Sequence, residues 1–270
     1  MKIDDCPVGT NDKKPGISYG AFHKITYYSR TTHSDRQTNI LLPPDYSPAR
    51  KYPVLYFLHG IFCDEDSLTS ASNGAVYMPV NLALEGKIKE MIIVCPNIYA
   101  QDEPDIKPGF YNAYFHGYNN FMYDLINDLM PFMEQHYSVA PGRENTAVCG
   151  FSMGGRTALY IVFKRPDLFG YVGAFSPAPG VVPGKDHNAV HTGLFSEDGF
   201  RIQDEHHTPF VTLISCGTKD SVVGQFPKTY HDILTKNSQP HHWIEVPDAD
   251  HDDRAIRTGL YAFISLVFQV

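Results

Sequence analysis

The pentapeptide Gly150-Phe151-Ser152-Met153-Gly154 has the G-x-S-x-G pattern of a nucleophile elbow. The residues TAVC before it predict a short buried strand, and RTALYIVFKRP after it predicts a helix. A sharp strand-to-helix turn strains the serine backbone and holds its hydroxyl above the sheet, while the glycines leave room for the crossing chain. The helix N-terminus also favours negative charge at this point. We therefore predict that Ser152 is a nucleophile; the alternative is a small residue in a tight turn.

A serine nucleophile needs a base and an orienting acid, and enzymes with this elbow carry them in the order serine, acid, histidine. Asp220 follows the later apolar run FVTLISCG, and His251 follows WIEV, the last predicted strand. The acids that crowd His251 are rivals for the orienting role: Asp248, Asp250, Asp252 and Asp253. We prefer Asp220 because a sequence neighbour rarely reaches the far ring nitrogen, and we expect the flanking acids to cap the following helix.

The negatively charged intermediate of acyl transfer needs two backbone N–H donors, which form an oxyanion hole. Met153, directly after the serine, is predicted to supply the first. Ile61, within YFLHGIFCDED, is predicted to supply the second, with Gly60 allowing the backbone to turn. We expect His59 to brace this loop rather than to act as the base.

These residues must be positioned by a sheet, and short, nearly continuous apolar runs predict strands that are buried on both faces. The runs lie at residues 54–60, 91–97, 146–150, 171–176 and 210–217. Helices are predicted at residues 74–86, 119–137, 153–165, 225–237 and 252–268. Pro131 is expected to kink the second helix or to end its regular part. Residues 19–43 instead predict an antiparallel hairpin. The alternation of strands and helices indicates one α/β domain over residues 1–270.

Residues 177–209 do not follow this alternation and are rich in proline, glycine and histidine. A loop of this length is typical of a lid or a substrate-binding loop, and a plain surface excursion is the alternative. His187 and His191, together with His206 and His207, raise a divalent ion as a further hypothesis. Because no H-E-x-x-H or similar spacing occurs, neither a metal nor a cofactor is predicted.

Composition excludes several classes of function. Of the 270 residues 43% are apolar, which is enough for a substantial core. The net charge of -8 provides no basic excess to neutralise phosphates, so general binding to nucleic acid or to an anionic membrane is not expected. No apolar run reaches the roughly 18 residues that span a bilayer.

The five cysteines show no C-x-x-C spacing, which argues against a zinc site and a dense disulfide framework. The opening MKIDDCPVGTNDKK lacks the apolar stretch of a signal peptide, which fits a cytoplasmic protein or one whose signal has been removed.

Three blocks of sequence stand out together: LLPPDYSPARKYPVLYFLHGIFCDEDSL, NNFMYDLINDLMPFMEQHYSV and CGFSMGGRTALYIVFKRPDLFGYVGAFSPA. They closely resemble the feruloyl esterases of carbohydrate esterase family 1, from about residue 20 onward. That family belongs to the esterase D-like α/β-hydrolases, with acetyl xylan esterases, S-formylglutathione hydrolases and mycolyltransferases. The resemblance implies an α/β-hydrolase fold, with a mostly parallel central sheet, an N-terminal antiparallel hairpin and helices on both faces.

The resemblance also implies a function. It makes Ser152, Asp220 and His251 the catalytic triad, with Ile61 and Met153 as oxyanion donors. It implies a secreted enzyme that hydrolyses feruloyl and related hydroxycinnamoyl esters of plant cell wall arabinoxylan or its oligosaccharides. Other members suggest an acetyl xylan or short-acyl esterase, or an S-formylglutathione hydrolase-like thioesterase, and a binding module without catalysis is a further alternative. Family members often have a tryptophan near the catalytic histidine, whereas the sole tryptophan here, Trp243, precedes it in the last predicted strand.

An aromatic acyl group would need a flat apolar slot with one or two polar groups for its phenolic end. Residues 97–121 are dense in tyrosine and phenylalanine and follow a predicted strand, where ligands bind in open α/β sheets. The predicted slot residues are Phe62, Phe110, Tyr111, Tyr114 and Phe115. For any one of these rings, ordinary packing beneath a loop is the alternative.

Overall fold

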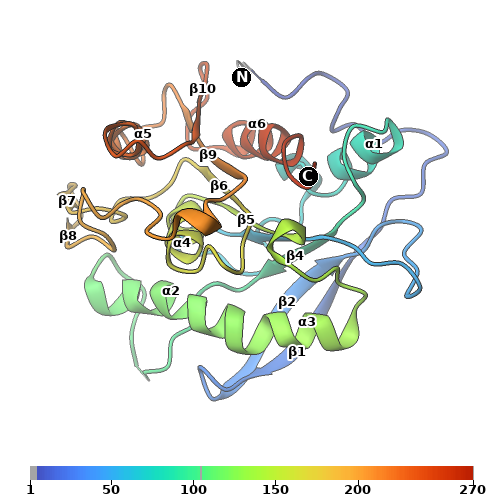
Figure 1. Ribbon diagram of the computed structural model, residues 1–270, viewed down its shortest axis with the longest axis horizontal. Helices are drawn as coiled ribbons and strands as arrows, with labels where there is room; N and C mark the ends of the chain where they lie inside the picture. Colours follow the sequence, from blue (N-terminus) through green and yellow to red (C-terminus); the bar gives the residue numbers. More distant parts are fainter. Residues whose placement is uncertain (1–4, 104, 270) are drawn as a thin grey trace.

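The computed structural model describes residues 5–103 and 105–269 of the chain. The main sheet consists of β1 (Phe22–Ser29), β2 (Ser34–Leu41), β3 (Val54–Leu58), β4 (Ile92–Pro96), β5 (Thr146–Phe151), β6 (Tyr171–Phe175), β9 (Val211–Gly217) and β10 (His242–Val246). These eight strands lie in the order β1-β2-β4-β3-β5-β6-β9-β10 (Figure 1). Strand β2 pairs antiparallel with both β1 and β4, and the other neighbours are parallel. The predicted hairpin followed by a parallel sheet is confirmed.

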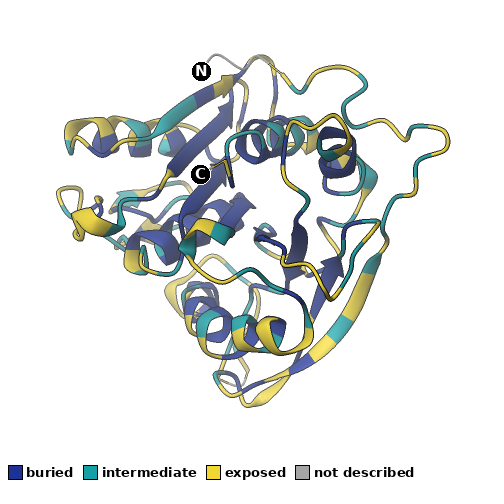
Figure 2. Cartoon of the chain, turned by 45° about the vertical axis from the view of Figure 1, so that its right-hand side comes forward, coloured by how far each residue is buried: buried dark blue, intermediate teal, exposed yellow. Residues whose placement is uncertain are grey.

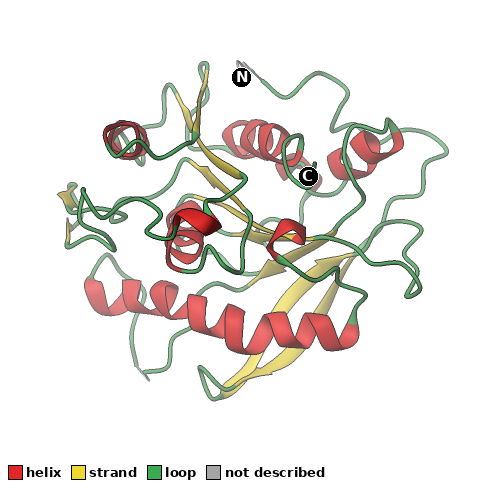
Figure 3. Ribbon diagram, in the orientation of Figure 1, coloured by secondary structure: helices red, strands yellow, loops and turns green. Residues whose placement is uncertain are grey.

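Helices cover both faces of this sheet, as predicted (Figures 1 and 3). They are α1 (Met78–Leu84), α2 (Asn112–Asp124), α3 (Met130–His136), α4 (Met153–Lys164), α5 (Phe226–Lys236) and α6 (Asp253–Ile264). In β3, Val54, Tyr56 and Leu58 belong to one hydrophobic core with α2 to α5, whereas Leu55 and Phe57 belong to a second core with α1 and α6. This burial on both faces is why the strands read as continuous apolar runs. No helix in the described part of the chain is long and apolar enough to cross a membrane.

The second predicted helix differs from the prediction at its start and in its middle. It begins at Asn112 rather than near residue 119, and its regular part ends at Asp124. A π-helical turn, η2 (Leu125–Leu129), then leads into α3. The predicted effect of Pro131 is thus seen as this wider turn, because proline lacks an N–H and its ring clashes with the carbonyl of the preceding turn.

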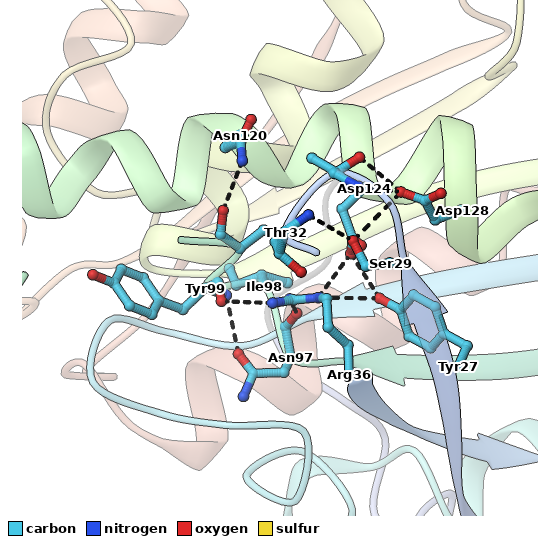
Figure 4. Close-up of polar contacts among 12 residues, drawn as sticks. Tyr27, Ser29, Thr32, Arg36, Asn97, Ile98, Tyr99, Asn120, Asp124 and Asp128 are labelled. Atoms are coloured by element: carbon cyan, nitrogen blue, oxygen red, sulfur yellow. Dashed lines mark hydrogen bonds and ion pairs between the residues drawn. The ribbon is translucent and has the colours of Figure 1, made fainter. Parts of the chain in front are cut away.

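A buried polar cluster joins the hairpin to this interrupted helix (Figure 4). Arg36 of β2 donates from Nε to Asp124 at 3.1 Å, and Tyr27 of β1 donates its hydroxyl to the same carboxylate at 2.6 Å. The other end of the guanidinium donates to the carbonyl oxygens of Tyr99, at 2.9 Å, and Asn97. Because residues 97–99 follow β4, Arg36 fixes the segment that leaves the carboxyl edge of the sheet.

Short elements complete the chain: η1 (Ala71–Asn73), η3 (Arg143–Asn145), β7 (Gly184–Lys185), β8 (Val190–His191) and η4 (Glu205–His207). Strands β7 and β8 form a separate two-stranded sheet within residues 177–209. Figure 2 shows buried central strands, and much of this long segment and of the edge strand β1 is exposed. Movement of the segment as a lid stays a prediction, and so does the single domain over residues 1–270.

Candidate active site

Ser152 lies in a strained turn between β5 and α4. Its φ of 57° and ψ of -118° are unusual for a residue that carries a Cβ atom. The flanking glycines are required by space: a Cβ atom on Gly150 would lie 2.4 Å from the carbonyl carbon of Gly154, and one on Gly154 would lie 2.1 Å from the carbonyl oxygen of Leu58. The turn therefore has the geometry of a nucleophile elbow, with the N-terminal end of α4 behind the serine.

The structure brings His251 and Asp220 together from the ends of two neighbouring parallel strands, β10 and β9. Nδ1 of His251 lies 2.9 Å from Oδ2 of Asp220. The ring of Phe151, next to Ser152, lies 4.2 Å from the imidazole, centroid to centroid, so His251 is beside the elbow. The carboxylate favours the tautomer with the proton on Nδ1, which makes Nε2 the basic nitrogen.

Asp220 is held in its ionised form. Burial by itself raises the pKa of Asp220, but the hydrogen bond and positive charge of His251 and further donors outweigh it, so the pKa lies below the ordinary value. Among those donors are the backbone N–H groups of Val222 and Val223, each 3.1 Å from Oδ1. A charged carboxylate is thus available at neutral pH to stabilise an imidazolium.

Three of the four rival acids around His251 have other partners. The Asp252 side chain caps α6 by accepting the N–H groups of Arg254 and Ala255 at 3.0 Å. Asp250 accepts the backbone N–H of His251 at 2.8 Å rather than a ring proton, and Asp248 pairs with Lys219 at 2.7 Å. The preference for Asp220 agrees with this geometry. The catalytic roles of Ser152, Asp220 and His251 stay predictions.

The predicted oxyanion donors both line the cavity that holds Ser152. Met153 is the first residue of α4, so its N–H has no carbonyl to bond within the helix. The loop of Ile61 turns in an unexpected way, because the left-handed residue is Phe62, with φ of 61°, and not Gly60. The N–H of Phe62 donates to the hydroxyl of Tyr118 at 3.1 Å, which holds this conformation from α2.

His59 braces the same loop, as predicted. Its Nδ1 lies 2.7 Å from the carbonyl oxygen of Gly60, and its Nε2 lies 2.9 Å from the backbone nitrogen of Ile98. Ile98 can only donate, so Nε2 accepts and Nδ1 carries the proton. Burial lowers the pKa of His59 to about 4, against weaker opposing effects of the Gly60 carbonyl, Asp64 and Glu65. The neutral ring thus ties the start of the oxyanion loop to the segment after β4.

We expect His59 to make the protein less stable in weak acid. A group with a folded pKa of about 4 and an ordinary pKa of 6.5 takes up its proton preferentially in the unfolded chain. The contribution of His59 to the free energy of unfolding is therefore complete above the pKa of the unfolded state. It declines as the pH falls toward the pKa of the folded state. Between about pH 7.5 and about pH 5 the decline amounts to about 2 kcal/mol of unfolding free energy.

Urea unfolding of the wild type and of His59→Gln at both pH values measures this decline, since the variant should lose about 2 kcal/mol less. Equal losses in the two proteins would contradict the assignment.

A cavity of about 420 Å³ opens beside Ser152. Its lining combines the serine and both predicted oxyanion residues with aromatic, aliphatic and polar side chains: Ile61, Phe110, Phe115, Ser152, Met153, Ala178, Pro179, Asp186, His187, Asn188, His191, Ser221, Val222 and Val223. The size is typical of sites for small organic ligands. The cavity is therefore large enough for an acyl group larger than acetyl.

The predicted slot residues divide into two sets. Phe110 and Phe115 line the cavity. Tyr114 is buried on α2 and stacks at 5.6 Å on the exposed ring of Phe62, and Tyr111 lies 6.3 Å from Tyr114. These three rings form an array next to the cavity, and their contact with substrate stays a prediction.

Sequence reasoning missed the polar wall that β7, β8 and their turn supply. Asp186 accepts from, or shares a proton with, His191 across 3.0 Å between Oδ2 and Nε2, and both residues line the cavity. The sequence raised His191, together with His187, as a hypothetical ligand of a divalent ion. In the described residues, no group of three or more histidine, cysteine or acidic side chains is arranged to hold a metal ion. The length of the segment predicted a lid or a substrate-binding loop, but only its histidine content hinted at which residues line the cavity.

Comparison with known proteins agrees with this geometry. A family model described as "Putative esterase" matches residues 29–253, which include the elbow, Asp220 and His251. The chain belongs to this esterase family. The structure of a CE1 ferulic acid esterase from Anaeromyces mucronatus, in complex with ferulic acid, has 51% sequence identity and a TM-score of 0.95, and the match covers 99% of this chain and 98% of that one. The predicted resemblance to carbohydrate esterase family 1 and the α/β-hydrolase fold of this esterase are thereby confirmed.

Two further proteins are similar to this chain, one in sequence and one in fold. An endo-1,4-beta-xylanase/feruloyl esterase of Xylanibacter ruminicola is 31% identical over an alignment of 165 residues, and the match covers 59% of this chain and 22% of that longer protein. The esterase therefore matches only a minor part of that relative's length. An S-formylglutathione hydrolase from Staphylococcus aureus is 17% identical with a TM-score of 0.64, over 93% of this chain and all of the other, and shares the fold alone.

Proposed function

We propose that this esterase hydrolyses feruloyl and related hydroxycinnamoyl esters by a serine acyl-enzyme mechanism. The observation that carries the proposal is the cavity in which Ser152 and both oxyanion residues meet an aromatic wall of Phe110 and Phe115. An aromatic acid fits such a wall, and the polar pair Asp186 and His191 is available for its phenolic end. The ferulic acid bound by the relative from Anaeromyces mucronatus supports this choice of acid.

The proposed reaction has two steps, acylation and deacylation of Ser152. Ser152 Oγ attacks the ester carbonyl carbon while His251 Nε2 takes its proton, and the N–H groups of Ile61 and Met153 stabilise the resulting oxyanion. His251 then returns the proton to the alcohol oxygen, the C–O bond breaks and the alcohol leaves. Water attacks the acyl-enzyme in the same way, with His251 as base, which releases the free acid and restores the Ser152 hydroxyl. Asp220 stabilises the imidazolium in both steps.

The natural substrate that we propose is feruloylated arabinoxylan or its oligosaccharides, degraded outside the cell. Support comes from the relative of Xylanibacter ruminicola, whose name joins xylanase and feruloyl esterase activities. Secretion follows from the same proposal, because intact cell wall polysaccharide does not enter cells. Finding the enzyme in the cells of its source organism and not in the culture fluid would contradict the extracellular role.

Hydrolysis of methyl ferulate, compared with release of acetate from an acetylated xylo-oligosaccharide, tests the substrate class. We expect kcat/KM to be at least about tenfold higher for the ferulate, since burying a large apolar group in the cavity contributes more than about 1.4 kcal/mol. Release of acetate alone would keep the mechanism and replace the substrate. Activity on neither ester would contradict the proposal and favour a thioesterase or a non-catalytic module.

A further inference from the structure

Three exposed aromatic rings form one surface beside the cavity, and we call Phe62, Phe110 and Tyr111 the aromatic rim. Their exposed fractions are 49%, 45% and 41%, which is high for large apolar side chains. The rings of Phe62 and Phe110 meet edge to face at 5.2 Å. Tyr114 lies beneath, 5.6 Å from Phe62 and 6.3 Å from Tyr111. The rim is therefore a continuous surface and not a set of scattered side chains.

The rim is held in place at a cost in free energy. Phe62 adopts a left-handed backbone conformation, which is unfavourable for a residue other than glycine. The hydrogen bond from its N–H to Tyr118 keeps it there. Tyr114 is itself supported by Tyr99, 4.6 Å away, and the carbonyl of Tyr99 is bound by Arg36. A strained residue that keeps an apolar ring in water, beside a catalytic cavity, points to a ligand for that ring.

The position of the rim assigns it a part of the substrate. Phe110 belongs to the rim and to the cavity wall, and Phe62 directly follows the oxyanion residue Ile61. Phe115 and His191, which also line the cavity, are buried. A cavity of about 420 Å³ can hold an acyl group but not a polysaccharide. The alcohol portion of the ester must therefore stay outside, across the cavity mouth.

We propose that the aromatic rim binds the pentose rings of the arabinoxylan that carries the scissile ester. This inference rests on the proposed function, which makes the alcohol a sugar. Sugar rings present C–H groups on their faces, and these pack on the electron-rich face of an aromatic ring. The rim contains no charged side chain, and the net charge of -8 disfavours an anionic membrane as the occupant. Three rings also form a small patch compared with a stable protein interface, so a carbohydrate is the better fit.

The test compares two substrates that share the acyl group and differ in the alcohol: a feruloylated arabinoxylo-oligosaccharide and methyl ferulate. Phe62→Asn removes a ring while keeping a residue that tolerates the left-handed conformation, and Tyr111→Ala removes a second ring at a distance from the oxyanion loop. In each variant we expect the ratio of kcat/KM, oligosaccharide over methyl ferulate, to fall about fivefold through a higher KM for the oligosaccharide. Tyr28→Ala, which removes an exposed ring on β1 outside the rim, is the matched control and should leave the ratio unchanged.

A second measurement does not depend on turnover. Calorimetric titration of Ser152→Ala with an unesterified arabinoxylo-oligosaccharide should give binding that weakens about fivefold when Phe62→Asn or Tyr111→Ala is added. An unchanged substrate ratio together with unchanged titration would overturn the proposal, as would parallel losses on both esters, which would place the rings against the acyl group. A different result is that the wild type fails to hydrolyse methyl ferulate while Phe62→Asn and Tyr111→Ala still weaken binding of the oligosaccharide. That result would contradict the proposed feruloyl specificity and support sugar binding at the rim.

Discussion

Ser152→Ala is expected to lower kcat on methyl ferulate by about 10⁵ to 10⁶, to the level left by the oxyanion hole and substrate binding. In the proposed mechanism the hydroxyl oxygen of Ser152 becomes acylated, and no other group can replace it at a turn whose geometry is fixed by Gly150 and Gly154. The substitution removes one oxygen atom from the elbow, so the thermal midpoint should stay within a few degrees of that of the wild type. Initial rates and a thermal scan on the same preparation measure both.

Covalent labelling separates loss of the nucleophile from loss of the site. A fluorophosphonate probe should label the wild type once and should not label Ser152→Ala. Ser196→Ala, at an exposed serine outside the cavity lining, is the control and should keep full rate and labelling. Labelled Ser152→Ala, or a variant with more than about a tenth of the wild-type rate, would require another nucleophile.

The central part of the site was predictable because it depends on strands that are buried on both faces. The apolar runs at residues 54–60 and 146–150 became β3 and β5, and these neighbours carry the oxyanion loop and the elbow at one edge of the sheet. The order serine, acid, histidine then places Asp220 and His251 after β9 and β10, which also pair. Local patterns and chain order are sufficient for this much, because a parallel sheet aligns the carboxyl ends of its strands.

The remaining parts depend on contacts that no local pattern encodes. A two-residue strand such as β8 has no periodicity, so the sequence did not show that Asp186 and His191 reach the cavity. Gly60 was expected to allow the turn of this loop, yet the residue with a left-handed conformation is Phe62, whose N–H donates to the hydroxyl of Tyr118. The early start of α2 was missed because Tyr114 and Phe115 suggest a loop wall by composition, and their burial is what favours a helix here.

Asp220→Asn is expected to lower kcat by about 10⁴, the size of the effect when asparagine replaces the triad acid of a serine protease. The reason lies in the two sets of partners around this side chain. Oδ1 accepts the N–H groups of Val222 and Val223, so the amide oxygen of asparagine must take that place. The NH₂ group then faces Nδ1 of His251, 2.9 Å away in the wild type, and donates to it. This fixes the tautomer with the proton on Nε2, and the imidazole cannot accept the proton of Ser152.

The same substitution at a rival acid gives a sharp control. Asp248 pairs with Lys219 on the surface and has φ of 57°, a conformation that asparagine also tolerates, so Asp248→Asn should keep kcat within about twofold. Initial rates on methyl ferulate for both variants, with circular dichroism to verify the fold, decide between the two acids. A large loss in Asp248→Asn with a small one in Asp220→Asn would transfer the orienting role to the sequence neighbour. A large loss in Asp220→Asn alone would show that the residue after β9, and not a sequence neighbour of His251, supplies the charge that stabilises the imidazolium.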